Sequence, residues 1–193
     1  CRPSLPCRAV AKRDPECRAG SAKGVGALPG DPRRAGRYNR SMTFRDRLLA
    51  TLRAVDPVLA VEGVLVIGSE VPNLLQPAAA STLVVSQDVD VGVPVSRHDE
   101  VKDALRRVEG LHPSSEEPSV WVPERPGLLE VNFVGMDPAT VDAADTYVLE
   151  DNGLPLLVFG QLSLLRPGVV VEVEGARAPL PRPAGLILEK LLT

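Results

Sequence analysis

The chain lacks several features that would place it in particular protein classes. No apolar run approaches the roughly 20 residues that a helix needs to cross a bilayer, since the longest candidate, residues 154–165, is interrupted by glycine and polar residues. A membrane protein is therefore not expected. The apolar segment of a secretory signal is also missing, which leaves the cytoplasm as the default location.

Cysteine and histidine are scarce, which disfavours two further kinds of site. The three cysteines, Cys1, Cys7 and Cys17, match no ligand spacing and specify neither a disulfide framework nor a metal site. The two histidines, His98 and His112, are separated by a predicted helix and lack a matching cysteine or carboxylate. A zinc site is therefore not predicted.

Charge is distributed unevenly along the 193 residues, whose net charge is -3. Residues 1–41 hold ten Lys/Arg against three Asp/Glu, whereas residues 42–193 hold twelve against twenty-two. The first segment has no helical pattern and no interleaved aromatics, which favours a disordered basic tail or upstream-translated sequence before Met42. The alternative is a basic arm for nucleic acid or an anionic surface. The second segment, 42–193, is predicted to be the folded domain.

Strands and helices alternate from Met42 onward. The pattern predicts helices over 44–55, 97–109 and 183–192, one or two helical turns within 70–81, and a short helix after Pro138. It predicts strands over 63–67, 82–95, 119–123, 128–134, 145–149, 155–159 and 169–174. This order indicates an α/β or α+β domain around one mixed sheet. The last helix reaches Thr193 without a C-cap signal, which predicts a truncated domain.

Asp88-Val89-Asp90 is the stretch that most clearly indicates chemistry. Residues i and i+2 of a strand share a face, about 6.5–7 Å apart, so the two carboxylates lie side by side among valines. Placing two carboxylates together is costly unless a cation neutralises them, and Mg²⁺ accepts carboxylate oxygens together with substrate phosphates. A solvated polar face is the simpler explanation of this short pattern when it stands alone.

Gly68-Ser69 follows a buried strand and adds a second signal. Glycine lets the backbone approach a phosphate closely, and Ser69 offers a hydroxyl and an N–H at a helix start. An ordinary strand-to-helix turn with Ser69 as N-cap would give the same residues. Taken with the aspartate pair, in this order and on these elements, the turn indicates a nucleotide site.

The sequence resembles the nucleotidyltransferase superfamily of the DNA polymerase beta type. The resemblance is carried by VLVIGS (64–69), QDVDVGV (87–93) and LLEVNFV (128–134), and by RAPLPRPAGLILEKLL (177–192). In these segments the sequence is most similar to the abortive-infection and toxin-type members of the superfamily. It spans about residues 60–192 and implies a mixed-sheet nucleotidyltransferase domain flanked by helices.

The resemblance implies a role for each matching position. Gly68 and Ser69 would hold the nucleotide triphosphate, Asp88 and Asp90 would bind Mg²⁺ or Mn²⁺, and Lys190 would meet the phosphates. Glu130 is the only carboxylate on the strand predicted over 128–134. The resemblance implies that it is the third metal ligand and a candidate general base. For Lys190, a lysine extending from an amphipathic helix into solvent is an equal alternative.

The expected activity is transfer of a nucleoside monophosphate from an NTP to an acceptor hydroxyl on RNA, protein or a small molecule. The resemblance also implies a toxin–antitoxin context with an antitoxin partner. The alternative is a catalytically inactive module of the same fold that binds or regulates a partner. Trp121, which alternates with Val120 and Val122, is expected to be a core residue rather than a base-stacking platform.

Overall fold

The computed structural model describes residues 42–75, 87–140, 142 and 144–192. These residues all belong to one compact unit, Arg40–Thr193. The predicted tail, 1–41, and the predicted strand residues 82–86 lie outside the described residues. None of the helices in the described part of the chain is both long and apolar enough to cross a membrane.

Helix α1 follows the apolar periodicity of the sequence closely. Helix α1 (Phe44–Ala54) begins at a capping box in which Thr43 Oγ1 accepts from the Asp46 N–H at 3.1 Å and Asp46 Oδ2 accepts from the Thr43 N–H at 2.9 Å. The other helices are α2 (Asp56–Leu59), α3 (Glu70–Leu75), α4 (His98–Leu105) and α5 (Pro183–Leu192), with 3-10 turns η1 (Val95–Arg97) and η2 (Gly160–Leu164).

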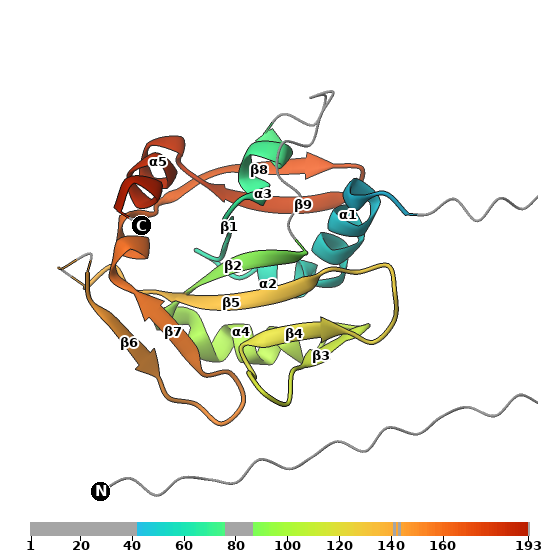
Figure 1. Cartoon of the computed structure of the whole chain (residues 1–193), viewed down its shortest axis with the longest axis horizontal. Helices are drawn as coiled ribbons and strands as arrows, with labels where there is room; N and C mark the ends of the chain where they lie inside the picture. Colours follow the sequence, from blue (N-terminus) through green and yellow to red (C-terminus); the bar gives the residue numbers. More distant parts are fainter. Residues whose placement is uncertain (1–41, 76–86, 141, 143, 193) are drawn as a thin grey trace, which may run out of the picture. The chain divides into compact units, whose positions relative to one another are not determined.

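Seven strands of the described chain form one mixed sheet (Figure 1). They are β1 (Leu65–Ile67), β2 (Asp88–Pro94), β3 (Leu111–Pro113), β4 (Val120–Pro123), β5 (Glu130–Met136), β6 (Thr146–Leu149) and β7 (Leu156–Phe159). The order is β1-β2-β5-β4-β3, with β7 beside the far end of β5 and β6 beside β7. Strands β8 (Pro167–Val173) and β9 (Ala176–Pro181) form a separate antiparallel pair. The predicted mixed sheet flanked by helices is confirmed.

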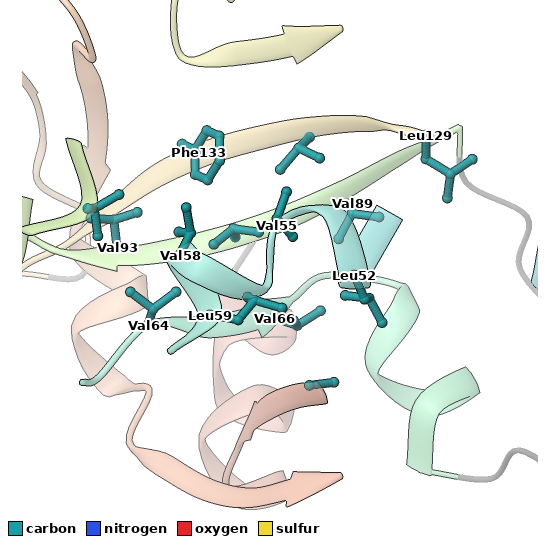
Figure 2. Packing of buried hydrophobic residues seen from close by; sticks show 14 of the residues in the cluster. Leu52, Val55, Val58, Leu59, Val64, Val66, Val89, Val93, Leu129 and Phe133 are labelled. Atoms are coloured by element: carbon teal, nitrogen blue, oxygen red, sulfur yellow. The ribbon is translucent and has the colours of Figure 1, made fainter. Parts of the chain in front are cut away.

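The two faces of the sheet differ in what covers them. On one face Val89 and Val93 of β2 and Phe133 of β5 pack against α1 and α2, as Figure 2 shows. Val91 of β2 belongs to the same buried cluster. On the other face a smaller apolar cluster forms from Leu65, Ile67, Met136, Leu162 and Leu165. Because side chains alternate along a strand, Asp88 and Asp90 fall on this second face.

Two details of the sequence prediction were wrong, and strands β3 and β9 and the short helix α2 were not predicted. The helix predicted over 97–109 is shorter and starts after the 3-10 turn η1. Beyond Pro138 the described residues form turns, because Asp137 and Asp142 each accept a backbone N–H two residues on. Strand β3 was not predicted, since its three residues give too short a run for alternation to be recognised. Trp121 packs edge-on against Phe133 at the border of the core, with ring centroids 6.2 Å apart.

A buried threonine ties α1 to the start of β5. The Thr51 hydroxyl donates to the Arg47 carbonyl at 2.9 Å and accepts from the Leu129 N–H at 2.8 Å. Thr51 is fully buried, so water cannot replace either partner. This contact fixes the backbone that leads directly into Glu130 and Asn132.

We expect Thr51→Val to lower the free energy of unfolding by about 1–3 kcal/mol, because it leaves the buried Leu129 N–H without its acceptor. Urea denaturation measures the loss. Thr51→Ser is the matched control, since it keeps the hydroxyl and should cost about 1 kcal/mol for the missing methyl group. Equal losses in the two variants would contradict the role given to the hydroxyl.

Candidate functional site

The parallel pairing of β2 with β5 brings the candidate residues of both strands to one face. Asp88 is the register partner of Glu130, and Asp90 is the partner of Asn132. Register partners in a sheet point to the same side. Glu130 therefore shares a face with both aspartates. It is the first residue of β5, and its side chain is exposed. Asp88 and Asp90 are both half-buried.

Asn132 joins the two aspartates. Its side-chain Nδ2 donates to Asp88 Oδ2 at 2.7 Å and to Asp90 Oδ1 at 3.2 Å. An amide NH₂ carries two protons, so it can serve both carboxylates at once. The sequence analysis gave Asn132 no role. The register with Asp90 that creates the bridge depends on strand pairing, which the sequence alone does not show.

Gly68 approaches Asp90 more closely than any other residue type could. It has φ +83°, and a Cβ built on it would lie 3.2 Å from Asp90 Cγ and closer still to Oδ2. The glycine therefore serves two purposes, a left-handed turn after β1 and room for the Asp90 carboxylate.

Ser69 and Glu70 form a pair that the sequence did not reveal. The Ser69 hydroxyl donates to Glu70 Oε1 at 3.3 Å, and Glu70 is only 1% exposed. Helix α3, which Glu70 opens, is six residues long. The Ser69 hydroxyl is thus directed at a neighbouring carboxylate, and a phosphate would have to compete with Glu70 for it.

A cavity of about 190 Å³ lies beside Asp90. Its lining comes from several elements and comprises Ile67, Gly68, Asp90, Val134, Phe159, Gln161, Leu162, Glu189 and Lys190. Three residues predicted for the site, Gly68, Asp90 and Lys190, are brought together here, whereas Ser69, Asp88 and Glu130 do not line it. The aspartate pair thus stands at the cavity's edge.

Helix α5 contributes an acid and a base to this cavity. Lys190 Nζ lies 3.3 Å from Glu189 Oε2, with the lysine side chain 56% exposed and the glutamate side chain 8% exposed. Sequence reasoning missed Glu189, because a charged residue next to a lysine on a terminal helix ordinarily faces solvent. In the described part of α5 the exposed positions are held by apolar residues, Ile187, Leu188 and Leu191. This apolar run was the one signal in the sequence that the charged residue within it could be buried.

The environment of Asp90 disfavours its charged form. Burial raises the pKa of the Asp90 carboxyl above its ordinary value, and the negative charges of Asp88 and Glu189 raise it further. The Asn132 hydrogen bond and the Lys190 charge act in the opposite direction without cancelling the rise. A carboxylate that is costly to ionise next to a second carboxylate is the arrangement that a bound cation relieves.

The residues present suit a divalent cation bound jointly by protein and substrate. Within the described ranges, no group of three or more His, Cys, Asp or Glu side chains is assembled that could hold a metal ion. Mg²⁺, however, is ordinarily held by one or two carboxylates together with phosphate oxygens and water. Asp88 and Asp90 supply those two carboxylates, and the missing Cβ of Gly68 leaves room for the Asp90 carboxylate itself.

Comparisons of the chain with known protein families, with curated proteins and with solved structures found no match. Function is therefore inferred from the geometry and chemistry of the site.

We expect Asp90→Asn to stabilise the protein at neutral pH relative to wild type. A carboxyl whose pKa is raised on folding contributes stability that is complete below its unfolded pKa of about 3.9, and this stability is lost as pH rises through the folded value. The advantage of Asp90→Asn should therefore shrink as pH falls from about 7 toward 4. Urea denaturation across this range measures it.

The solvent-exposed Glu124→Gln is the control and should show no such trend. A difference between Asp90→Asn and wild type that stays constant with pH would contradict the effect attributed to burial of Asp90.

We expect Gly68→Ala to destabilise the protein more than Gly175→Ala does. Both glycines have positive φ, +83° and +75°, so each substitution costs about 1–2 kcal/mol for the backbone. Only at Gly68 does the new methyl group meet another residue, Asp90, since Gly175 has nothing within 4 Å. The excess loss for Gly68→Ala in urea denaturation measures the close approach, and equal losses would refute it.

Proposed function

We propose that this chain is a metal-dependent nucleotidyltransferase that moves a nucleoside monophosphate from an NTP to an acceptor hydroxyl and releases pyrophosphate. One observation carries the proposal. Two carboxylates, Asp88 and Asp90, share a strand face and one bridging amide, and Asp90 is set against Gly68 in the wall of a cavity that Lys190 also lines. The resemblance to the DNA polymerase beta superfamily, carried by Gly68-Ser69 and Asp88-Val-Asp90, supports the same activity.

Each side chain has a distinct task in this reaction. Asp88 and Asp90 would hold Mg²⁺ or Mn²⁺, which would supply positive charge to offset the negative charge of the triphosphate. Lys190 binds phosphate oxygens from the cavity wall. Gly68 lines the same cavity, and the Ser69 hydroxyl would reach the phosphates only by exchanging its hydrogen bond to Glu70 for one to them.

Glu130 is assigned to the acceptor side of the site as general base, and the expected role of third metal ligand is not proposed for it, because the described residues assemble no group of three such ligands. It is exposed, on the same face as Asp88, where a bulky acceptor can reach it. The acceptor oxygen bonds to the α-phosphorus, the bond from that phosphorus to the pyrophosphate oxygen breaks, and the acceptor proton passes to the Glu130 carboxylate. RNA, a protein or a small molecule could supply the hydroxyl. The toxin-type resemblance extends the proposal to a toxin with an antitoxin partner.

A second function, a catalytically inactive binding or regulatory module, is favoured by one specific observation. The Asn132 amide donates to both aspartates, so the pair is partly satisfied by the protein itself. Calorimetry with Mg²⁺ and each NTP, combined with a turnover assay, separates the two functions. Binding without turnover supports the module, and binding with pyrophosphate release supports the enzyme.

We expect Asp88→Ala and Asp90→Ala each to lower NTP-dependent pyrophosphate release by about a hundredfold or more, because each removes half of the carboxylate pair that positions the cation and triphosphate. Circular dichroism should show an intact fold. Glu172→Ala, which removes an exposed carboxylate from β8, is the matched control and should retain full activity. Unchanged turnover in both aspartate variants would refute the assignment.

A further inference from the structure

The cavity beside Asp90 changes character across the sheet. Its floor is built by strands that follow the spatial order β1, β2, β5 and β7 (Figure 1). Gly68 and Asp90 stand at the β1–β2 end, and Val134 and Phe159 at the β5–β7 end. Two inter-strand spacings separate β2 from β7, which is about 10 Å. The cavity therefore has a polar end, at Gly68 and Asp90, and an apolar end, at Val134 and Phe159.

The segment that closes the apolar end is continuous in sequence. Phe159 ends β7, and Gln161 and Leu162 belong to the 3-10 turn η2 that follows it. Leu162 is buried, while Phe159 and Gln161 are half-buried. An aromatic ring and a leucine suit the flat apolar face of a nucleobase, and such stacking tolerates any base.

Gln161 differs from every other residue of the lining. It is the one neutral side chain there that can both donate and accept hydrogen bonds. Among the residues that the structure describes, none forms a hydrogen bond with its amide. The amide is therefore available to a ligand that enters between η2 and the sheet.

The size of the cavity sets what can enter it. At about 190 Å³ it is smaller than the roughly 300–1,000 Å³ of pockets that enclose a whole drug-sized ligand. It accommodates one part of a nucleotide and leaves the remainder exposed. A base at the β5–β7 end with its phosphates at the β1–β2 end places the ribose between them.

We propose that Gln161 selects the nucleobase of the bound NTP, with the base lying against Phe159 and Leu162. This inference rests on the proposed function and adds a specificity-determining residue to it. A glutamine amide presents one donor beside one acceptor and favours a base edge that offers the complementary pair. A glutamate carboxylate at the same position only accepts, so it favours the adjacent N1–H and N2–H donors of guanine.

The test is isothermal calorimetry of the full chain with Mg²⁺ and ATP, GTP, CTP, UTP or inorganic tripolyphosphate, which lacks a base. Gln161→Glu should raise the affinity for GTP relative to the other three NTPs by about tenfold. Gln161→Leu, similar in size and without hydrogen bonds, should reduce the spread among the four NTPs and leave tripolyphosphate affinity unchanged. Ser163→Ala is the matched control, because Ser163 lies in η2 without lining the cavity.

The outcomes separate this inference from the proposed function. Wild-type NTP binding with a base preference that both Gln161 variants change, and Ser163→Ala does not, supports it. Equal binding of all four NTPs by wild type, or ratios that the Gln161 variants leave unchanged, overturns the inference and leaves the nucleotidyltransferase proposal standing. Absence of NTP binding to wild type overturns both.

Discussion

The alignment of β2 with β5 is the constraint on which the candidate site depends. Parallel pairing over seven residue positions sets Asp88 beside Glu130 and Asp90 beside Asn132. A shift of one residue would turn every side chain of one strand to the opposite face, and the aspartates would enter the core among Val89, Val91 and Phe133. The valine and phenylalanine face is fully buried against α1 and α2, so the apolar core fixes the register that the polar face uses.

Much of the fold could be predicted because the main elements carry strong periodic signals. Helix α1 has its apolar stripe and its Thr43 cap, and β2 and β5 alternate clearly. The short strand β3 and the turns after Asp137 could not be predicted, since three residues give no periodicity and an Asp side chain that accepts a nearby N–H competes with helix formation. Local sequence patterns thus predict the long helices and strands. In the turns after Asp137, a side chain accepts a backbone N–H that a helix would otherwise use.

Part of the geometry of the site was predictable. Strand alternation was enough to put Asp88 and Asp90 on one face, whereas the close approach expected between Gly68 and a phosphate is, in the structure, one between Gly68 and Asp90. The Asn132 bridge and the burial of Glu189 depend on residues 42 or more positions away in sequence, or on how α5 packs against η2. Such contacts are set by tertiary structure, and no single-sequence pattern encodes them. The contact of Ser69 is local by contrast, because its hydroxyl donates to Glu70, the next residue in the chain.

The amide that joins the aspartates has a genetic consequence. Asparagine and aspartate codons differ at a single nucleotide, and their side chains have nearly the same shape. One point mutation at position 132 would therefore exchange a proton donor for a third carboxyl group at the register position opposite Asp90. A single mutation could thus convert two carboxylates that accept hydrogen bonds from one amide into three carboxylates that need a cation to offset their charge.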